Sequence, residues 1–176
     1  MMPTKTIAIM GPTASGKSDL AILLAQKYNG EIISADSRQV YRGLDIGSGK
    51  VSVDEQALVP HHLLDVASPK RTYNVTHFVR DAKRAIADIR KRGKTPIICG
   101  GTGFWIQALI EDQPFPAVKP NSALRKQLER LSTEELFDQL KAKDPKRAET
   151  IDAQNKVRLI RALEIVEALG AVPPLP

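Results

Sequence analysis

The segment GPTASGKS, at residues 11–18, has the residue types and the spacing of a phosphate-binding loop. It follows a short apolar run at residues 7–10, and its glycines let the backbone curl so that N–H groups point at phosphate oxygens. Lys17 adds a positive charge, and Ser18 offers a hydroxyl group to a magnesium ion, Mg2+. The loop therefore predicts a diphosphate or triphosphate site made of Gly11, Pro12, Thr13, Ala14, Ser15, Gly16, Lys17 and Ser18.

Two further polar residues follow apolar segments later in the chain. Asp36 comes directly after the apolar segment 31–35. Three interpretations of Asp36 remain open. It could bind magnesium or the acceptor substrate of a nucleotide kinase, act as a general base, or cap a helix or a turn. Thr102 follows Gly100 and Gly101, two glycines that would permit the close approach of a ligand. Its hydroxyl could hydrogen-bond that ligand or cap the next helix.

Strands and helices alternate over the first 110 residues. Strands are expected at residues 6–10, 31–35 and 95–99, and helices from the glycine loop to about residue 28, at 75–89 and at 104–110. The first helix is expected to bury Leu20, Leu23, Leu24 and Tyr28. This order predicts an α/β fold with a parallel sheet flanked by helices. Ligands of such sheets bind at the carboxyl ends of the strands, where the loop, Asp36 and Thr102 would meet.

The second part of the chain is polar and favours helices. They are expected at residues 122–131, 133–143, from 147 onward and at 155–169, and Ser132 with Glu135 forms a possible capping box. The expected organisation is an α/β core at 1–112, a helical insertion at 113–150, and a helix at 151–176 that returns to the core.

Composition limits the classes of partner. The net charge of +6 suits a polyanion such as nucleic acid. No apolar run approaches the ~20 residues of a membrane span, and no secretory signal is present, so a cytoplasmic protein without a membrane partner is expected. The single cysteine, Cys99, excludes an internal disulfide bond. The adjacent His61 and His62 have no third ligand at a recognisable spacing, so no zinc site is predicted.

Five segments together resemble one enzyme family, the tRNA dimethylallyltransferases, also called tRNA isopentenyltransferases. They are, in chain order, GPTASGKS, SADSRQVYRGLDIGSGK, PHHLLDV, RGKTPIICGGTGFW and NKVRLIRALE. The resemblance implies a P-loop NTPase-like sheet with a small helical insertion. It also implies transfer of the dimethylallyl group from dimethylallyl diphosphate to the exocyclic amine of the adenosine 3'-adjacent to the anticodon of tRNA. It further implies that diphosphate is released and that Mg2+ is the cofactor.

The resemblance also implies roles for individual residues. Asp36 matches the residue that receives or orients the proton of the amine, Thr102 lies near donor and nucleotide, and Lys17 completes the catalytic set. The implied tRNA contacts are Asp36, Ser37, Arg38, Gln39, Thr102, Arg125, Val157, Arg158, Leu159, Ile160 and Arg161. Valine at position 157 departs from the polar residue that the family often has there. Because family members are usually longer, a C-terminally truncated member is expected. The protein is also expected to be a monomer.

Three other functions fit parts of the pattern. An ATP-dependent P-loop kinase for a small molecule would use the same loop, with the helices after Pro120 imitating its arginine-bearing lid. An adenylate prenyltransferase would use the same isoprenoid donor on a free nucleotide. A non-catalytic tRNA-binding remnant would keep the RNA contacts alone. Binding of ATP would indicate the kinase, and transfer to AMP but not to tRNA would indicate the adenylate prenyltransferase. Affinity for tRNA without turnover would indicate the non-catalytic remnant.

Overall fold

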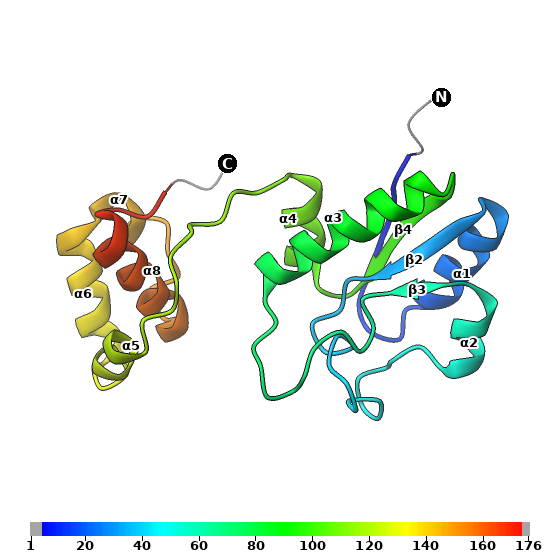
Figure 1. Cartoon of the computed structure of the whole chain (residues 1–176). Helices are drawn as coiled ribbons and strands as arrows, with labels where there is room; N and C mark the ends of the chain where they lie inside the picture. Colours follow the sequence, from blue (N-terminus) through cyan, green and yellow to red (C-terminus); the bar gives the residue numbers. More distant parts are fainter. Residues whose placement is uncertain (1–4, 174–176) are drawn as a thin grey trace. The chain divides into compact units, whose positions relative to one another are not determined.

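The structure, a computed structural model, describes residues 5–173 and divides the chain into two compact units (Figure 1). The first unit is Met1–Gln113 and contains the sheet, and the second is Pro114–Pro176 and is helical. Within residues 5–173, no helix combines the length and the apolar character that crossing a membrane requires.

The first unit is built on a four-stranded parallel sheet. Its strands are β1(Ile7–Met10), β2(Gly30–Ser34), β3(His61–His62) and β4(Thr95–Gly100), in the spatial order β1-β4-β2-β3. The two central strands, β2 and β4, are almost wholly buried, as expected for parallel strands that helices cover on both faces. The predicted fold class is confirmed.

The described part of the first unit, residues 5–113, has four helices: α1(Lys17–Lys27), α2(Val53–Leu58), α3(Val75–Lys91) and α4(Gly103–Ile110). One face of the sheet is covered by α1, while α3 and α4 lie on the other (Figure 1). The predicted helix over 75–89 is confirmed, because Asn74 Oδ1 accepts a hydrogen bond from the His77 N–H, and Phe78 and Ile89 are buried. The Phe78 ring stacks on Trp105 of α4 with ring centroids 4.9 Å apart.

The prediction for the buried face of α1 was wrong for Leu20, Leu23 and Tyr28 and is borne out in part for Leu24. The helix buries Ala21, Ile22 and Ala25 against the sheet, and Leu23 remains 58% exposed. Small alanine side chains let the helix axis approach the strands closely, and Leu24 packs partly buried against the same core, whereas Leu20 and Leu23 lie exposed. Because α1 carries apolar residues on more than one side, the helical period alone does not select the face that packs.

The segment 37–71 contains a helix and a short strand that the sequence pattern did not predict, α2 and β3. Helix α2 begins with a capping box in which Ser52 Oγ accepts from the Glu55 N–H and the Glu55 carboxylate accepts from the Ser52 N–H. No residue of α2 is buried, so the helix lacks the apolar stripe by which sequence patterns reveal helices.

The second unit contains α5(Ser122–Leu128), α6(Thr133–Lys143), α7(Pro145–Ala148) and α8(Lys156–Leu169). Leu136 and Leu140 of α6 pack with Leu159 and Leu163 of α8 in its core, and the predicted capping box of α6 is present. The expected boundary at 150/151 does not coincide with a division between compact units, and the expected return of the last helix to the α/β core stays a prediction. Helix α8 belongs to the same unit as residues 114–150, because its apolar side fills the core that α5 and α6 leave open.

Candidate active site

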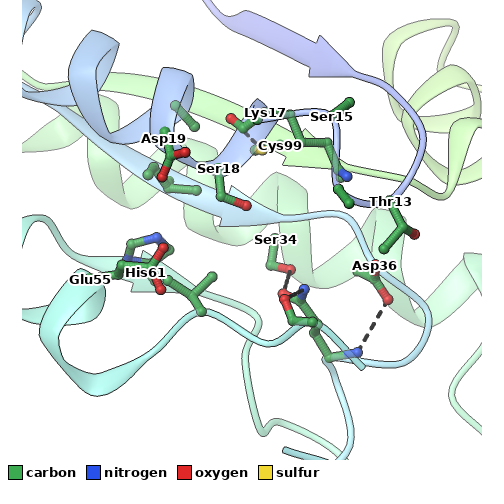
Figure 2. Close-up of a pocket in the computed structure, with 18 of the residues that line it drawn as sticks. Thr13, Ser15, Lys17, Ser18, Asp19, Ser34, Asp36, Glu55, His61 and Cys99 are labelled. Carbon is green, nitrogen blue, oxygen red and sulfur yellow. Dashed lines mark hydrogen bonds between the residues drawn. The ribbon is translucent and has the colours of Figure 1, made fainter. Parts of the chain in front are cut away.

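A cavity of about 330 Å³ opens at the carboxyl ends of the strands (Figure 2). The loop after β1, the residues after β2 and the end of β4 contribute to its walls. The structure thus brings the predicted phosphate loop and Asp36 together in one cavity. Its lining residues are Thr13, Ala14, Ser15, Gly16, Lys17, Ser18, Asp19, Ala21, Ile32, Ser34, Asp36, Gln39, Ser48, Gly49, Val51, Glu55, His61, Cys99 and Gly100.

The phosphate loop curls through left-handed backbone conformations at Ala14 (φ 61°) and Gly16 (φ 76°). Gly16 is the N-cap of α1, and no side chain caps the first turn of this helix. The N–H groups of that turn are therefore available as hydrogen-bond donors at the positive end of the helix dipole. The Lys17 ammonium folds back over the loop and donates to the Pro12 carbonyl at 2.8 Å.

Asp36 uses one carboxylate oxygen to close a turn. Its Oδ1 accepts hydrogen bonds from the N–H groups of Arg38 at 2.8 Å and Gln39 at 3.3 Å. The turn-cap interpretation is therefore correct for this oxygen. Among residues 5–173, no donor is hydrogen-bonded to Oδ2, so a role in chemistry would use a different atom of the same side chain.

Thr102 joins the loops that follow β2 and β4. Its Oγ1 accepts from the Ser37 N–H at 3.0 Å, and its own N–H donates to the Ala35 carbonyl at 3.2 Å. Thr102 occupies the N-cap position of α4, but its side chain does not cap that helix. The hydroxyl instead fixes the first residue after Asp36, which makes Thr102 a support of the Asp36 turn.

Packing inside the sheet requires a glycine at position 100, a reason that the sequence did not indicate. A Cβ atom on Gly100 would lie 2.2 Å from the Ala35 carbonyl oxygen, whereas one on Gly101 would have its nearest neighbour at 3.6 Å. The close approach that requires glycine is therefore between β4 and the end of β2. Gly100 also lines the cavity, and the expected approach of a ligand to Gly100 and Gly101 stays a prediction.

Gln39 forms a bridge across the wall of the cavity. Ser34 Oγ donates to Gln39 Oε1 at 3.2 Å, and Gln39 Nε2 donates to the Gly49 carbonyl at 2.7 Å. The side chain thus connects the end of β2 to the loop that precedes α2. Its predicted contact with tRNA stays a prediction.

Sequence reasoning missed several groups in this cavity, among them Ser48 with Gly49, Glu55, and His61. The capping-box spacing from Ser52 to Glu55 was the available signal for the second group. His61 Nδ1 lies 2.9 Å from the Val59 carbonyl oxygen, and burial lowers the pKa of its imidazole. The neutral form is therefore favoured in the cavity.

The two adjacent histidines diverge, as the extended backbone requires. His61 lines the cavity, whereas His62 Nε2 lies 2.7 Å from Glu31 Oε2. Arg92 and Lys94 also donate to this buried carboxylate. The hydrogen bond from Arg92 lowers the pKa of Glu31 most, burial opposes this, and Lys94 and His62 lower it further. In the described part of the chain, no group of three His, Cys, Asp or Glu residues could hold a metal ion.

The second unit holds the other residues expected to contact tRNA. Arg125 donates through Nε and Nη2 to Glu164 at 2.9 and 2.8 Å, and Arg161 donates to the same carboxylate and to the Val118 carbonyl. Leu159 and Ile160 are buried in the core of the unit, whereas Arg158 is exposed and Val157 is 77% exposed. Within residues 157–161, the side chains of Val157, Arg158 and Arg161 are therefore the ones that reach the surface.

The parallel sheet and the glycine loop between β1 and α1 define a protein of the P-loop class. A family model described as IPP transferase matches residues 39–174, and one described as isopentenyl transferase matches residues 4–66. The chain belongs to the IPP transferase family.

Similar proteins carry related names. The chain is 51% identical over 162 residues to the tRNA dimethylallyltransferase of Leuconostoc citreum, covering 92% of the chain and 55% of the relative. It is 48% identical over 169 residues to that of Anoxybacillus flavithermus, covering 96% and 54% respectively. The chain therefore spans about half the length of the curated relatives that it matches.

Solved structures of similar proteins agree with the fold. The full-length tRNA isopentenylpyrophosphate transferase of Bacillus halodurans is 40% identical with a TM-score of 0.64, covering 96% of the chain and 57% of that protein. A eukaryotic dimethylallyltransferase acting on tRNA is 34% identical with a TM-score of 0.80, covering 93% and 41% respectively.

Proposed function

We propose that this chain carries the donor site and the acceptor residues of a tRNA dimethylallyltransferase. The reaction transfers the dimethylallyl group from dimethylallyl diphosphate to the exocyclic amine of the adenosine 3'-adjacent to the anticodon, and it releases diphosphate. The observation that carries the proposal is that a phosphate loop and a carboxylate with one unused oxygen, Asp36, line the same cavity. The names of the relatives support the choice of substrates. We take the protein to be a monomer that acts in the cytoplasm.

The donor's diphosphate would lie in the phosphate loop. It gains negative charge as the carbon–oxygen bond to the dimethylallyl group breaks. The N–H groups of the first turn of α1 and the Lys17 ammonium are fixed donors for that charge. Lys17 would exchange its hydrogen bond with the Pro12 carbonyl for one with the diphosphate.

The residues of the cavity fit a magnesium ion. Ser18 contributes a hydroxyl group and Glu55 a carboxylate to the lining of the cavity, and oxygen atoms are the ligand type that Mg2+ prefers. We assign the ion to Ser18. When bound, it would supply positive charge beside the leaving diphosphate.

The acceptor amine is a poor nucleophile because its lone pair is delocalised into the adenine ring. Asp36 Oδ2 would take the proton of this amine as the new nitrogen–carbon bond forms, while Oδ1 keeps the turn closed. The target base must leave its stack to enter the cavity. Ser37, Arg38, Gln39 and Thr102 would contact the nucleotide, and Arg125, Val157, Arg158 and Arg161 would contact the RNA from the second unit.

The test uses this chain with labelled dimethylallyl diphosphate, Mg2+ and unmodified tRNA, and it measures label on the RNA. Asp36→Asn keeps an oxygen for the turn but removes the base, so transfer should fall about 10²–10⁴-fold while donor binding persists. Asp36→Ala should lose transfer equally and be less stable, because two backbone hydrogen bonds lose their acceptor. Transfer by Asp36→Asn within tenfold of wild type would refute the general-base role. Phosphoryl transfer from ATP, or prenylation of AMP but not of tRNA, would overturn the proposed function.

A further inference from the structure

The first unit has a second hollow, of about 600 Å³, that shares no lining residue with the candidate active site. It lies between Arg42, the segment 66–73 and the first turns of α3. Its lining includes four basic side chains, those of Arg42, Lys70, Arg71 and Arg80, and all four residues are exposed.

Three of these four positive charges have no acidic partner. The one acid in the lining, Asp81, is paired with Arg80 at 2.8 Å and also accepts from the Tyr73 hydroxyl at 3.1 Å. The hydrogen bond from Arg80 lowers the pKa of Asp81, so this pair is fully charged and nearly neutral overall at pH 7. No residue in the range 5–173 forms an ion pair with Arg42, Lys70 or Arg71 through its carboxylate.

The hollow is held in shape by hydrogen bonds. The Arg42 N–H donates to the Ala67 carbonyl at 3.0 Å, and the Ala67 N–H donates to the Val40 carbonyl at 2.9 Å. The Arg42 Nε donates to the Asp65 carbonyl at 2.8 Å, which orients the guanidinium and leaves the donors of its two NH₂ groups for a ligand. The Tyr73 N–H donates to the Tyr41 hydroxyl at 3.0 Å.

The hollow is also close to the candidate active site. Gln39 lines the cavity and Arg42 lines the hollow, and three residues of extended chain span at most ~11 Å. A polymer that places one unit in the cavity can therefore place a neighbouring unit at the hollow. The short distance between the cavity and the hollow would not strengthen the binding of a small anion, whereas a polyanion could occupy both at once.

We propose that Arg42, Lys70 and Arg71 bind the phosphodiester backbone of the RNA whose adenosine enters the candidate active site. The inference rests on the proposed function. Basic side chains on phosphates fix the register and orientation of a nucleic acid without reading its sequence. The hollow thus positions the RNA, and the selection of the base is left to the cavity.

The test measures the affinity of this chain for unmodified tRNA over a series of salt concentrations. The variant Arg42→Gln/Arg71→Gln is compared with Lys27→Gln/Lys91→Gln, a control that also removes two exposed positive charges but outside the hollow. Each phosphate contact contributes about 0.7–0.9 to the slope of log affinity against log salt. The hollow variant should therefore lose about 1.4–1.8 of that slope and the control less than half as much, with unchanged circular dichroism.

Equal losses of slope in the two variants, an unchanged slope in the hollow variant, or no tRNA binding by wild type would overturn the proposal. If phosphatidylserine vesicles compete with tRNA for wild type but not for the hollow variant, the occupant of the hollow is a lipid surface and not RNA. Binding of labelled dimethylallyl diphosphate is measured in parallel. If the donor binds and is transferred to tRNA while the hollow variant behaves as its control, the hollow is refuted and the proposed function stands.

Discussion

Glu164 is the residue of the second unit whose removal has the most clearly calculable effect. Its carboxylate is 2% exposed and accepts from the Asn121 N–H at 2.6 Å and from Arg125 and Arg161. Glu164→Gln preserves the side-chain shape and one acceptor oxygen for Asn121. It removes the negative charge and directs N–H groups at a guanidinium.

The pKa of Glu164 gives the magnitude. Burial alone would raise this pKa, but the hydrogen bonds from Arg125, Asn121 and Arg161 outweigh burial and lower it to about 2 from the ordinary 4.5. A tenfold change in proton affinity corresponds to about 1.4 kcal/mol, so these contacts stabilise the folded unit by about 3 kcal/mol at neutral pH. The arginine side chains are 38% and 35% exposed and regain water when the charge is lost. The cost therefore stays near the lower end of the ~3–5 kcal/mol for breaking a buried pair.

Native-state hydrogen exchange of the α8 amides measures this effect within one unit. Glu164→Gln should lower their protection roughly 100-fold at pH 7, since about 3 kcal/mol corresponds to two factors of ten. Because the folded pKa is lowered, the stabilisation is present above pH ~4.5 and is lost as the pH falls toward 2. The control is Glu167→Gln on the same helix, whose pair with Lys143 is exposed and contributes little. If Glu164→Gln lowers protection no more than Glu167→Gln, the assignment of a stabilising buried carboxylate is wrong.

Three further measurements concern the first unit. Gly100→Ala should destabilise it by about 1–3 kcal/mol in urea unfolding followed by tryptophan fluorescence, because a Cβ would lie 2.2 Å from the Ala35 carbonyl oxygen. Gly101→Ala, with its nearest neighbour at 3.6 Å, should be close to neutral, and equal costs would refute the packing argument. Glu31 has a lowered pKa, so wild type should lose stability below pH ~4.5 more steeply than Glu31→Gln, and parallel pH curves would contradict this. Burial raises the pKa of the Cys99 thiol, so a thiol-specific reagent should modify the native protein at pH 7 far more slowly than the urea-unfolded one.

Local patterns predicted most of the elements that position the site. Helix α3 has apolar residues at helical spacing and a capping asparagine, Asn74, and both features act within a few residues of one another. The parallel sheet followed from the alternation of strands and helices, and that alternation also placed Asp36 and the phosphate loop at the same edge. These inferences need no knowledge of distant contacts.

The sequence-based predictions are wrong or silent where contacts between residues far apart in the chain decide the structure. The face of α1 that packs depends on how closely the sheet can approach Ala21 and Ala25, which a periodic pattern does not encode. The need for glycine at position 100 depends on the Ala35 carbonyl, 65 positions earlier in the chain. The buried carboxylate Glu164 meets Arg125 across 39 positions, and no local spacing reveals such a pair.

The structure decides part of the alternatives that the sequence left open: Asp36 caps a turn, Thr102 does not cap α4, and their roles toward a substrate stay predictions. Asp36 closes a turn with Oδ1 and has no protein donor on Oδ2 in the described chain, and the Thr102 hydroxyl fixes that turn through Ser37. Arg125 likewise uses Nε and Nη2 on Glu164, and the remaining N–H donors of its guanidinium are available to a partner. Each side chain is thus held by the fold through one part before any ligand arrives. Ordering such a group on binding costs less conformational entropy, because most of its rotamer freedom is already lost in the free protein. This restraint therefore favours the substrate contacts proposed for Asp36, Thr102 and Arg125.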